Sequence, residues 1–517
     1  MKRKGGCRMD RRTRAGLWLL LFLALFFALN LASLTRFPLV HSDESWLSGL
    51  TRNMMESGSL GVTEPFFDLK PRYPHAIKAL FHVLQMPLIQ LFGYSAFSVR
   101  LLSLLFATGC LFLAYRCARE NASSRLALCF LLLVCVNGSF LAAAHTARQE
   151  IVLLCAMLLL LLILLKGKGD VTTRHALLLG AVTGLCVGIH PNSLLLCMGC
   201  GFAMLFPMLA RRKIRWKPLA AYVTVTGMIA FLFVGISFSF DHQFPAHYMA
   251  YGESEFDLIV PISNKFGEFG YYIQKLWYGV SGTYTLPLLR PQLLLCLCLA
   301  VWAGIRAIRT KDDGLLIILG MCLGALLGTI VIGRYNQLSA VLWMFLFLML
   351  LPPLLAKCKG RKTALLALTA IFAVSSVLSF APAFNASYDD YLDKIAVYVA
   401  PGEKTLANLN TGFYFANDAL LDYRNLSYLQ ENGLSFAQYV KSRGIQVILW
   451  SEEMDFIYQR RPTWNIIYGN PRYVEEVEAF LVENCTELGT FEDAHYAVRI
   501  VSEIGKPYRV RVYHVIP

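Results

Sequence analysis

Long apolar runs alternate with short polar connections through roughly the first 385 residues of the chain. Many of these runs are close to the roughly twenty residues that a helix needs to cross a bilayer. From about Ser387 onward the runs disappear and polar and apolar residues mix at strand and helix periods. The pattern predicts a polytopic α-helical membrane protein with a separate C-terminal domain.

Basic residues fall at every second connection between the apolar runs, which is the pattern of the positive-inside rule. Seven Lys and Arg precede Leu17, and further basic clusters occupy the connections at 116–125, 166–174, 211–217, 306–311 and 357–362. The connections between them are 36–95, 145–150, 190–192, 240–286 and 333–337. This alternation predicts about eleven spans, with the N-terminus in the cytoplasm and the C-terminal residues outside. We therefore expect a multi-pass protein of the plasma or inner membrane.

The first apolar run follows a basic start and could be read as a signal peptide. Its length of about twenty residues is long for that role, so we expect an uncleaved first span. The N-terminal module is thus predicted to cover residues 1–385, with a long first outer loop at 36–95.

Residues 386–517 are predicted to form an extracytoplasmic α/β domain. Strand-like segments occur at 394–400, 446–450, 496–501 and 508–516, and residues 473–484 have a helical pattern. This part has 12 Lys and Arg against 18 Asp and Glu, so its charge is opposite in sign to that of the predicted inner loops. An acidic balance is consistent with export.

The formal charge of +14 does not indicate a nucleic-acid partner, because the basic residues are confined to short connections. Most of the fourteen cysteines lie inside apolar runs, where they are expected to pack as small hydrophobic residues rather than form a disulfide framework. The sequence has no credible nucleotide-binding or zinc-protease motif. We expect no bound cofactor, and no metal ligands beyond a possible Asp43–Glu44 pair are identifiable.

Asp43 and Glu44 stand side by side directly after the first apolar run. Repulsion between adjacent carboxylates raises the pKa of one of them, and partial burial raises it further. One of the two is therefore expected to have a raised pKa and to serve as a general base. The alternatives are a solvated helix N-terminus and a metal site that would need further ligands.

The same outer loop carries four basic residues, Lys70, Arg72, His75 and Lys78, against the inside bias of positive charge. A phosphate held at the membrane surface would explain them, since Arg binds it as a fork and Lys as a point charge. Binding of lipid headgroups is the alternative.

Other ionisable residues lie where predicted spans meet the outer side. Arg148 and Glu150 could line a cavity or neutralise each other, and His190 could be a functional residue or a satisfied helix-end histidine. Arg334, next to Tyr335, could bind an anion or extend its charged end to the membrane–water interface.

These motifs together resemble the GT-C superfamily of glycosyltransferases, in particular the protein O-mannosyltransferases and the lipid A aminoarabinose transferase. The matching segments are "DESW" at 43–46, the proline-containing passage at 73–106, "ARQE" at 147–150, "HPN" at 190–192 and "RY" at 334–335. The resemblance covers about residues 15–385. The prolines before Gly93 are spaced differently from those of the family, so the phosphate-binding cation stays open among Lys70, Arg72, His75 and Lys78.

The resemblance implies an inverting transferase that moves a hexosyl or pentosyl group from a polyprenyl-phosphate donor to an extracytoplasmic glycan, lipid or protein. Asp43 would be the general base and Glu44 would tune or position it. The residues expected to bind substrate are Lys70, Arg72, His75, Lys78, Arg148, Glu150, His190, Arg334 and Tyr335. The alternatives are a secondary transporter, which would place ionisable groups near the bilayer midplane, and a membrane scaffold whose outer domain binds a partner.

Overall fold

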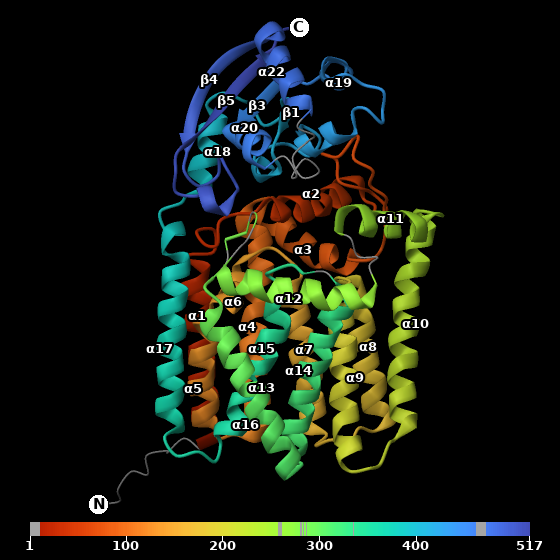
Figure 1. Cartoon of the computed structure of the whole chain (residues 1–517), viewed down its shortest axis with the longest axis vertical. Coiled ribbons are helices and arrows are strands. Elements are labelled where there is room, and N and C mark those ends of the chain that lie inside the picture. Colours follow the sequence, from red (N-terminus) through yellow and green to blue (C-terminus); the bar gives the residue numbers. More distant parts are fainter. Residues whose placement is uncertain are drawn as a thin grey trace, which may run out of the picture.

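The computed structural model describes residues 11–256, 261–279, 282, 284–285, 287–333, 335–461 and 472–517. An upright helix bundle occupies one end, a β-sheet with helices occupies the other, and a layer of short helices lies between them (Figure 1). The bundle contains α1 (Arg11–Leu31), α4 (Ala96–Asn121), α5 (Ser124–Cys135), α6 (Gly138–His145), α7 (Glu150–Lys166), α8 (Thr173–Leu185), α9 (Ser193–Ala210), α10 (Trp216–Phe240), α13 (Arg290–Thr310), α14 (Asp313–Ile332), α15 (Ala340–Leu348), α16 (Leu351–Leu355) and α17 (Arg361–Phe380).

Seven helices in the described part of the chain are long and apolar enough to cross a membrane, or eight if the bent pair α5–α6 is one span. The chain is thus a multi-pass membrane protein, but the expectation of about eleven spans is wrong by this measure. Charge clusters mark where apolar runs end and do not measure helix length. Apolar runs such as Thr173–Gly188 and Ala340–Leu355 form helices of fewer than 18 residues, which are too short to be counted as spans.

Small residues on α14 let it approach α9 closely. A Cβ added to Gly320 would lie 2.6 Å from the carbonyl oxygen of Phe202, and one added to Gly324 would lie 2.4 Å from that of Met198. Residues four apart share one helix face, so these glycines form the contact stripe that small residues often form between membrane helices.

Connections predicted to lie on one side of the membrane gather at one end of the bundle. At the end far from the sheet, Arg211 donates to the carbonyl oxygen of Lys168 (2.9 Å) and pairs with Asp313. The connections at 36–95, 147–150, 190–192 and 333–337 meet at the other end, near the sheet. The bundle is therefore two-sided in the way the charge alternation requires.

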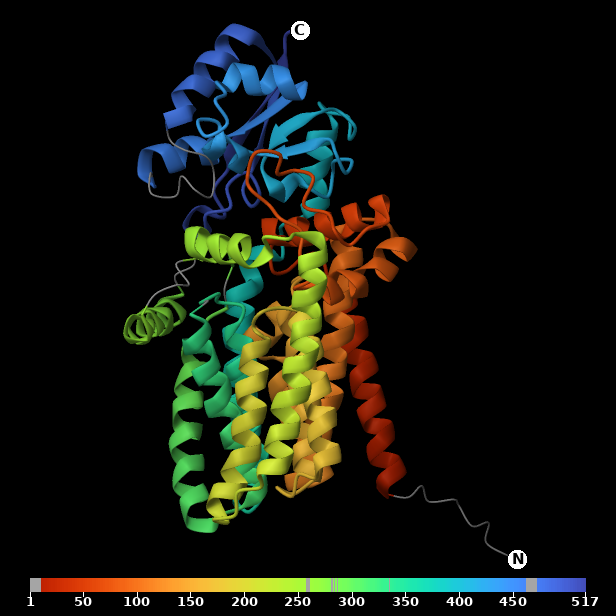
Figure 2. The ribbon, with the colours of Figure 1, turned by 90° about the vertical axis from the view of Figure 1, so that its right-hand side faces the viewer.

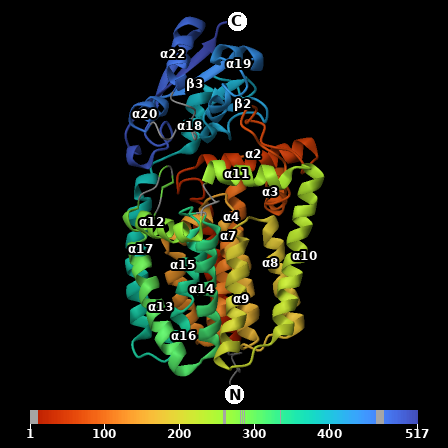
Figure 3. The same ribbon diagram turned by 45° about the vertical axis from the view of Figure 1, so that its right-hand side comes forward.

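The layer next to the sheet contains α2 (Ser42–Ser57), α3 (Ala79–Phe92) and α11 (Phe244–Phe256), while α12 (Ile262–Tyr278) crosses the same end of the bundle (Figures 2 and 3). These helices belong to the two longest predicted outer connections. Among them, α2 packs against the C-terminal part of the chain, at residues Leu409–Thr411.

The C-terminal part contains a five-stranded mixed sheet in the order β2-β1-β3-β5-β4. β1 is parallel to both β2 and β3, whereas β5 is antiparallel to both β3 and β4. The elements are α18 (Tyr388–Ala396), β1 (Thr405–Ala407), β2 (Leu420–Asp422), α19 (Phe436–Arg443), β3 (Val447–Ser451), α20 (Glu452–Arg460), α22 (Arg472–Asn484), β4 (Cys485–Asp493) and β5 (Tyr508–Val515).

Strands β3 and β5 and helix α22 confirm the predictions for those segments, but the strands predicted at 394–400 and 496–501 are wrong. In the first segment, residues 394–396 form the end of α18, whose N-terminus is capped by the Ser387 hydroxyl, and residues 397–400 are a turn and coil. In the second, the backbone N–H of Arg499 donates to the buried carboxylate of Glu453 (2.8 Å) and not to a neighbouring strand. A side-chain carboxylate thus accepts the hydrogen bond that a neighbouring strand would accept in a sheet.

Hydrogen bonds fix the sheet to the first long loop. The backbone N–H of Asp422 donates to the carbonyl oxygen of Phe66 (3.1 Å), and Nη1 of Arg52 donates to that of Phe415 (2.9 Å). The C-terminal part therefore forms a roof over residues of the loop at 36–95.

Candidate active site

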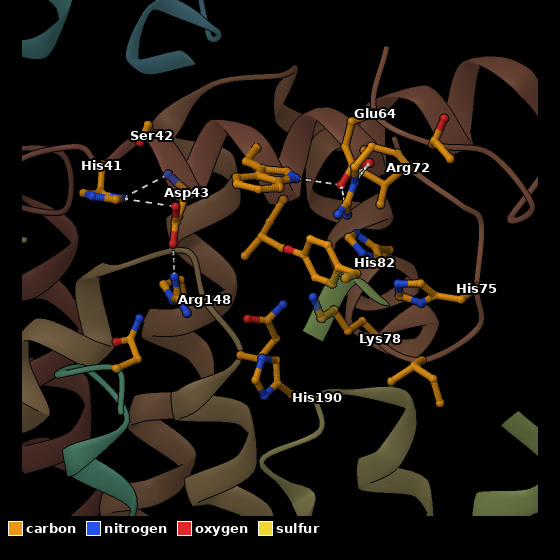
Figure 4. Close-up of a pocket in the computed structure, with 18 of the residues that line it drawn as sticks. His41, Ser42, Asp43, Glu64, Arg72, His75, Lys78, His82, Arg148 and His190 are labelled. Carbon is orange, nitrogen blue, oxygen red and sulfur yellow. Dashed lines mark hydrogen bonds and ion pairs between the residues drawn. The ribbon is translucent and has the colours of Figure 1, made fainter. Parts of the chain in front are cut away.

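A cavity of about 400 Å³ lies between the end of the bundle and the sheet. Its lining comes from α2 and the rest of the loop at 36–95, from the α6–α7 connection, from residues near 190 and 333–337, and from the C-terminal part. Figure 4 shows Asp43, His41 and Arg148 on one side and Arg72, His75 and Lys78 on the other. One cavity thus collects side chains from segments far apart in the sequence.

Asp43 lies in the first turn of α2, where His41 is the N-cap. The Nδ1 atom of His41 accepts a hydrogen bond from the backbone N–H of Asp43 (3.0 Å), and the imidazole stacks on the ring of Tyr284 (3.7 Å between centroids). Burial lowers the pKa of His41 to about 4, so this histidine is neutral at pH 7. The Asp43 carboxylate accepts hydrogen bonds from Arg148 and from the hydroxyl of Tyr284.

The surroundings of Asp43 keep it ionised. Burial alone would raise the pKa of its carboxyl, but attraction to Arg148 and the hydrogen bond from Tyr284 outweigh burial and lower this pKa below its usual range. The expectation that one of the pair has a raised pKa is therefore not met at Asp43. A group in this state can accept a proton once its present partners are exchanged for a substrate.

Glu44 points away from the cavity, although it is adjacent in sequence. Its fully buried carboxylate accepts two hydrogen bonds from Arg100 (2.7 and 2.6 Å) and others from the backbone N–H groups of His41 (2.9 Å) and Ala147 (2.8 Å). Glu44 is therefore not among the residues that line the cavity. Its bonds instead tie α2 to α4 and to the segment that carries Arg148.

Two of the four basic residues of the first loop do not present a cation to the cavity. Lys70 is buried, with Nζ over the rings of Trp46 (5.1 Å) and Phe67 (5.2 Å), and it lies outside the cavity lining. His75 lines the cavity, but burial lowers its pKa to about 3 and keeps it neutral.

The other two, Arg72 and Lys78, line the cavity as cations. Arg72 donates two hydrogen bonds to Glu64 (2.9 and 2.7 Å). Burial alone would raise the pKa of Glu64, but the charge of Arg72 and the hydrogen bonds from Arg72 and Trp46 outweigh burial and lower this pKa to about 2. Lys78 is the N-cap of α3 and has φ of 89°, a left-handed conformation that is uncommon outside glycine. Such strain concentrates at functional sites, and the positive end of a helix favours anions.

Arg148 binds two carboxylates at once. It donates to Asp43 and also, from Nε (3.3 Å) and Nη2 (3.2 Å), to Glu150. Arg148 lines the cavity and Glu150 does not, because Glu150 lies behind it at the start of α7. Arg148 and Glu150 thus neutralise each other as an ion pair, and Arg148 also places its guanidinium in the cavity wall.

His190 and Tyr335 also line the cavity. The Nδ1 atom of His190 accepts a hydrogen bond from the backbone N–H of Asn192 (3.0 Å), and the hydroxyl of Tyr335 donates to the carbonyl oxygen of Lys265 (2.8 Å). Arg334 lies outside the described residues.

Among the lining residues that the sequence did not single out are His41, Glu64, Tyr284, Arg424 and Arg499. Glu64 could have been noticed as an acid within a basic loop. The two arginines come from the C-terminal part, about 380 to 450 residues from Asp43 in the chain, and no local pattern marks them. Within the described ranges, no group of three or more His, Cys, Asp or Glu side chains is placed to hold a metal ion.

Comparison with known proteins gives one family match, which covers part of the chain. Residues 80–236 match the family described as dolichyl-phosphate-mannose-protein mannosyltransferase. This segment begins just after Lys78 and includes Arg148 and His190. A comparison with curated protein sequences gives no match.

Solved structures match over nearly the whole chain. ArnT from Cupriavidus metallidurans in the apo state is 15% identical, with a TM-score of 0.58 and coverage of 97% of this chain and 98% of ArnT. The same protein bound to undecaprenyl phosphate gives 16% identity, a TM-score of 0.51 and coverage of 96% and 98%. The oligosaccharyltransferase of Archaeoglobus fulgidus in the apo form gives 14% identity, a TM-score of 0.53 and coverage of 89% and 72%. At these identities the similarity establishes the fold.

Proposed function

Since the chain has the fold of the GT-C membrane glycosyltransferases, we propose that it transfers a sugar from a polyprenyl-phosphate donor to a hydroxyl or amine of an acceptor. The observation that carries this proposal is the single cavity that holds both an ionised carboxylate, Asp43, and the cations of Arg72 and Lys78. One ArnT structure is described as bound to undecaprenyl phosphate, which supports a lipid-phosphate donor for the shared fold.

Asp43 would act as the general base. The acceptor oxygen or nitrogen attacks the anomeric carbon, its proton passes to the Asp43 carboxylate, and the bond from that carbon to the phosphate oxygen breaks with inversion. The acceptor must take over a hydrogen-bonding position on Asp43 that Arg148 or Tyr284 occupies in the structure. Glu44 would position Asp43 and Arg148 indirectly, through α2 and Ala147.

Lys78 and Arg72 would bind the donor phosphate. Lys78 combines a charged side chain with the N-terminus of α3, and the Arg72 guanidinium is held in place by Glu64. Both would stabilise the negative charge that develops on the leaving phosphate, an effect worth on the order of 3 kcal/mol for each well-placed donor. His190 and Tyr335, nearer the bundle, would contact the sugar phosphate or the start of the prenyl chain.

The end of the bundle that carries the cavity would face the extracytoplasmic side. The basic clusters at the opposite end support this orientation. The prenyl tail would remain among the membrane lipids while the sugar phosphate enters the cavity. The acceptor, a glycan, lipid or protein of the cell envelope, would approach beneath the C-terminal roof.

The test is whether the purified chain in nanodiscs cleaves a synthetic undecaprenyl-phosphate sugar. We expect release of undecaprenyl phosphate together with sugar transfer. Lys78→Gln should raise the donor KM, whereas Lys168→Gln, an exposed lysine at the opposite end, should leave it unchanged. Sugar uptake into vesicles without cleavage would instead indicate a transporter, and neither activity would indicate a scaffold.

A further inference from the structure

Two arginines from the C-terminal part reach the cavity that contains Asp43. Arg424 follows β2 in a short 3₁₀ helix, and Arg499 lies between β4 and β5. Both side chains are more than nine-tenths buried, and both line the cavity. The roof therefore contributes positive charge to a site whose other cations come from the membrane module.

Arg424 is held in one orientation. Its Nε atom and its backbone N–H both donate to the same carboxylate oxygen of Asp422 (2.7 and 2.9 Å), and its guanidinium lies over the rings of Trp46 (4.6 Å) and Phe67 (5.2 Å). Its Nη2 atom is buried and has no hydrogen-bond partner in the described part of the chain. A buried donor without a partner is unfavourable, and a bound acceptor atom would remove that cost.

Arg499 is anchored in a similar way. Its Nε atom lies 3.2 and 3.4 Å from the two carboxylate oxygens of Glu453, and its backbone N–H donates to one of them. The charge of Arg499 contributes to the lowered pKa of His41, and that of Arg424 contributes to the lowered pKa of Asp43. Arg499 also lines a smaller cavity together with His41 and Tyr284, and Arg424 lies over Trp46, which is in α2 three residues after Asp43. Both arginines thus lie near the first turns of α2, which carry Asp43.

The donor phosphate already has cations on the other side of the cavity, where Arg72 and Lys78 lie (Figure 4). We propose that Arg424, together with Arg499, binds a negatively charged group of the acceptor, a phosphate or a carboxylate, close to the hydroxyl or amine that Asp43 deprotonates. This inference rests on the proposed function and narrows its acceptor to an anionic molecule. A planar guanidinium suits both anions, because its N–H groups match the oxygens of either.

The test uses glycerol, glycerol 3-phosphate and glycerate as probes, since they share hydroxyls and differ in charge. Binding to the full-length protein in nanodiscs is measured by saturation-transfer NMR with undecaprenyl phosphate at saturation, so that the donor site is filled. We expect both anions to bind at least about tenfold more tightly than glycerol. The stronger of the two identifies the anion as phosphate or carboxylate. Equal binding of all three probes would overturn the proposal without any variant.

Variants then locate the site. Arg424→Lys keeps a positive charge opposite Asp422 but lacks the planar guanidinium with its paired N–H donors. The double variant Asp422→Asn/Arg424→Gln removes both charges of the ion pair together. We expect weaker anion binding in the first and a loss of about tenfold or more in the second, with undecaprenyl phosphate binding unchanged. Arg509→Gln, an exposed arginine on β5, is the control.

Wild-type anion affinity in both Arg424 variants would overturn the proposal. Loss of undecaprenyl phosphate binding in these variants would also overturn it, because Arg424 would then belong to the donor site. If the wild-type protein neither binds undecaprenyl phosphate nor cleaves the donor, the proposed function itself is wrong, which is a different result.

Discussion

Arg148 is shared between Asp43, which lines the cavity, and Glu150, which lies behind it. Its positive charge lowers the pKa of Asp43 and so favours the ionised form. A phosphate or an acceptor that draws Arg148 towards itself would leave Asp43 in a buried setting with less positive charge, and the pKa of Asp43 would rise. The same arginine therefore sets how strong a base Asp43 is.

Arg148→Gln should move the acid limb of the pH profile of kcat/KM to higher pH. The wild-type pKa of Asp43 is lowered, so its basic form persists below the usual range; without the guanidinium, burial raises the pKa, by about 1 to 3 units for loss of a close opposite charge. The measurement is sugar transfer between pH 4 and pH 8. Arg211→Gln, at the opposite end of the bundle, is the control, and an unshifted acid limb in Arg148→Gln would contradict this role.

Glu44 was expected to tune Asp43, and its position shows why neighbours in sequence need not share a site. Successive residues of a helix point about 100° apart, so one carboxylate enters the cavity while the next faces α4. The "DESW" motif singled out both carboxylates, and the structure places only Asp43 in the cavity lining. The buried partner Arg100 lies 56 residues away in the chain and could not be paired with Glu44 from sequence.

Glu44→Gln should reduce stability more than it affects the chemistry. Arg100 is fully buried and would lose its only charged partner among the described residues, a loss on the order of 3 kcal/mol. Thermal unfolding in detergent should show a lower midpoint than for Glu56→Gln, which removes a surface carboxylate paired with Arg52. A Glu44→Gln protein of wild-type stability that has lost turnover would instead make Glu44 a reacting group.

At the level of elements, apolar runs predicted the helices well and the sheet only in part. Strands β3 and β5 were predictable because their residues are strongly apolar or alternate in polarity, whereas β1 and β2 are three residues each and give almost no pattern. The wrong strand at 394–400 contains apolar residues that also suit the buried face of α18. Short elements depend on tertiary contacts that local sequence does not encode.

The glycine stripe of α14 provides a test of bundle packing. Gly324→Ala places a methyl group against the backbone of α9 and should destabilise the protein by about 1 to 3 kcal/mol, as overpacking does. Gly201→Ala on α9 is the matched control, because a Cβ there meets nothing within 4 Å. Thermal unfolding of the two variants compares them, and equal midpoints would show that the close approach of α9 and α14 does not limit stability.

At the scale of the whole molecule, the charge alternation anticipated which connections share an end of the bundle, although it overestimated the number of long spans. It could not indicate that the C-terminal part would supply cations to the cavity, because that contact joins residues more than 300 positions apart. The resemblance singled out Asp43, whose role stays a prediction, and only the three-dimensional structure shows that the C-terminal part covers the cavity.

Membrane orientation can be tested with cysteines introduced at Lys213 and at Glu431, both exposed and at opposite ends of the molecule. In intact cells or spheroplasts, a membrane-impermeant maleimide should label Glu431→Cys and not Lys213→Cys, relative to the unmodified protein. Both should react after the membrane is permeabilised. Labelling of Lys213→Cys alone in intact cells would place the cavity on the cytoplasmic side and contradict the proposed orientation.

The central claim is that Asp43 takes the acceptor proton during sugar transfer, and Asp43→Asn tests it most directly. Asparagine keeps the size and polarity of the side chain but cannot serve as the base. The measurement is single-turnover transfer from a synthetic undecaprenyl-phosphate sugar in nanodiscs, alongside donor binding. We expect donor binding within a few-fold of wild type and a transfer rate lower by roughly 10²- to 10⁴-fold. Transfer by Asp43→Asn at the wild-type rate would contradict the account.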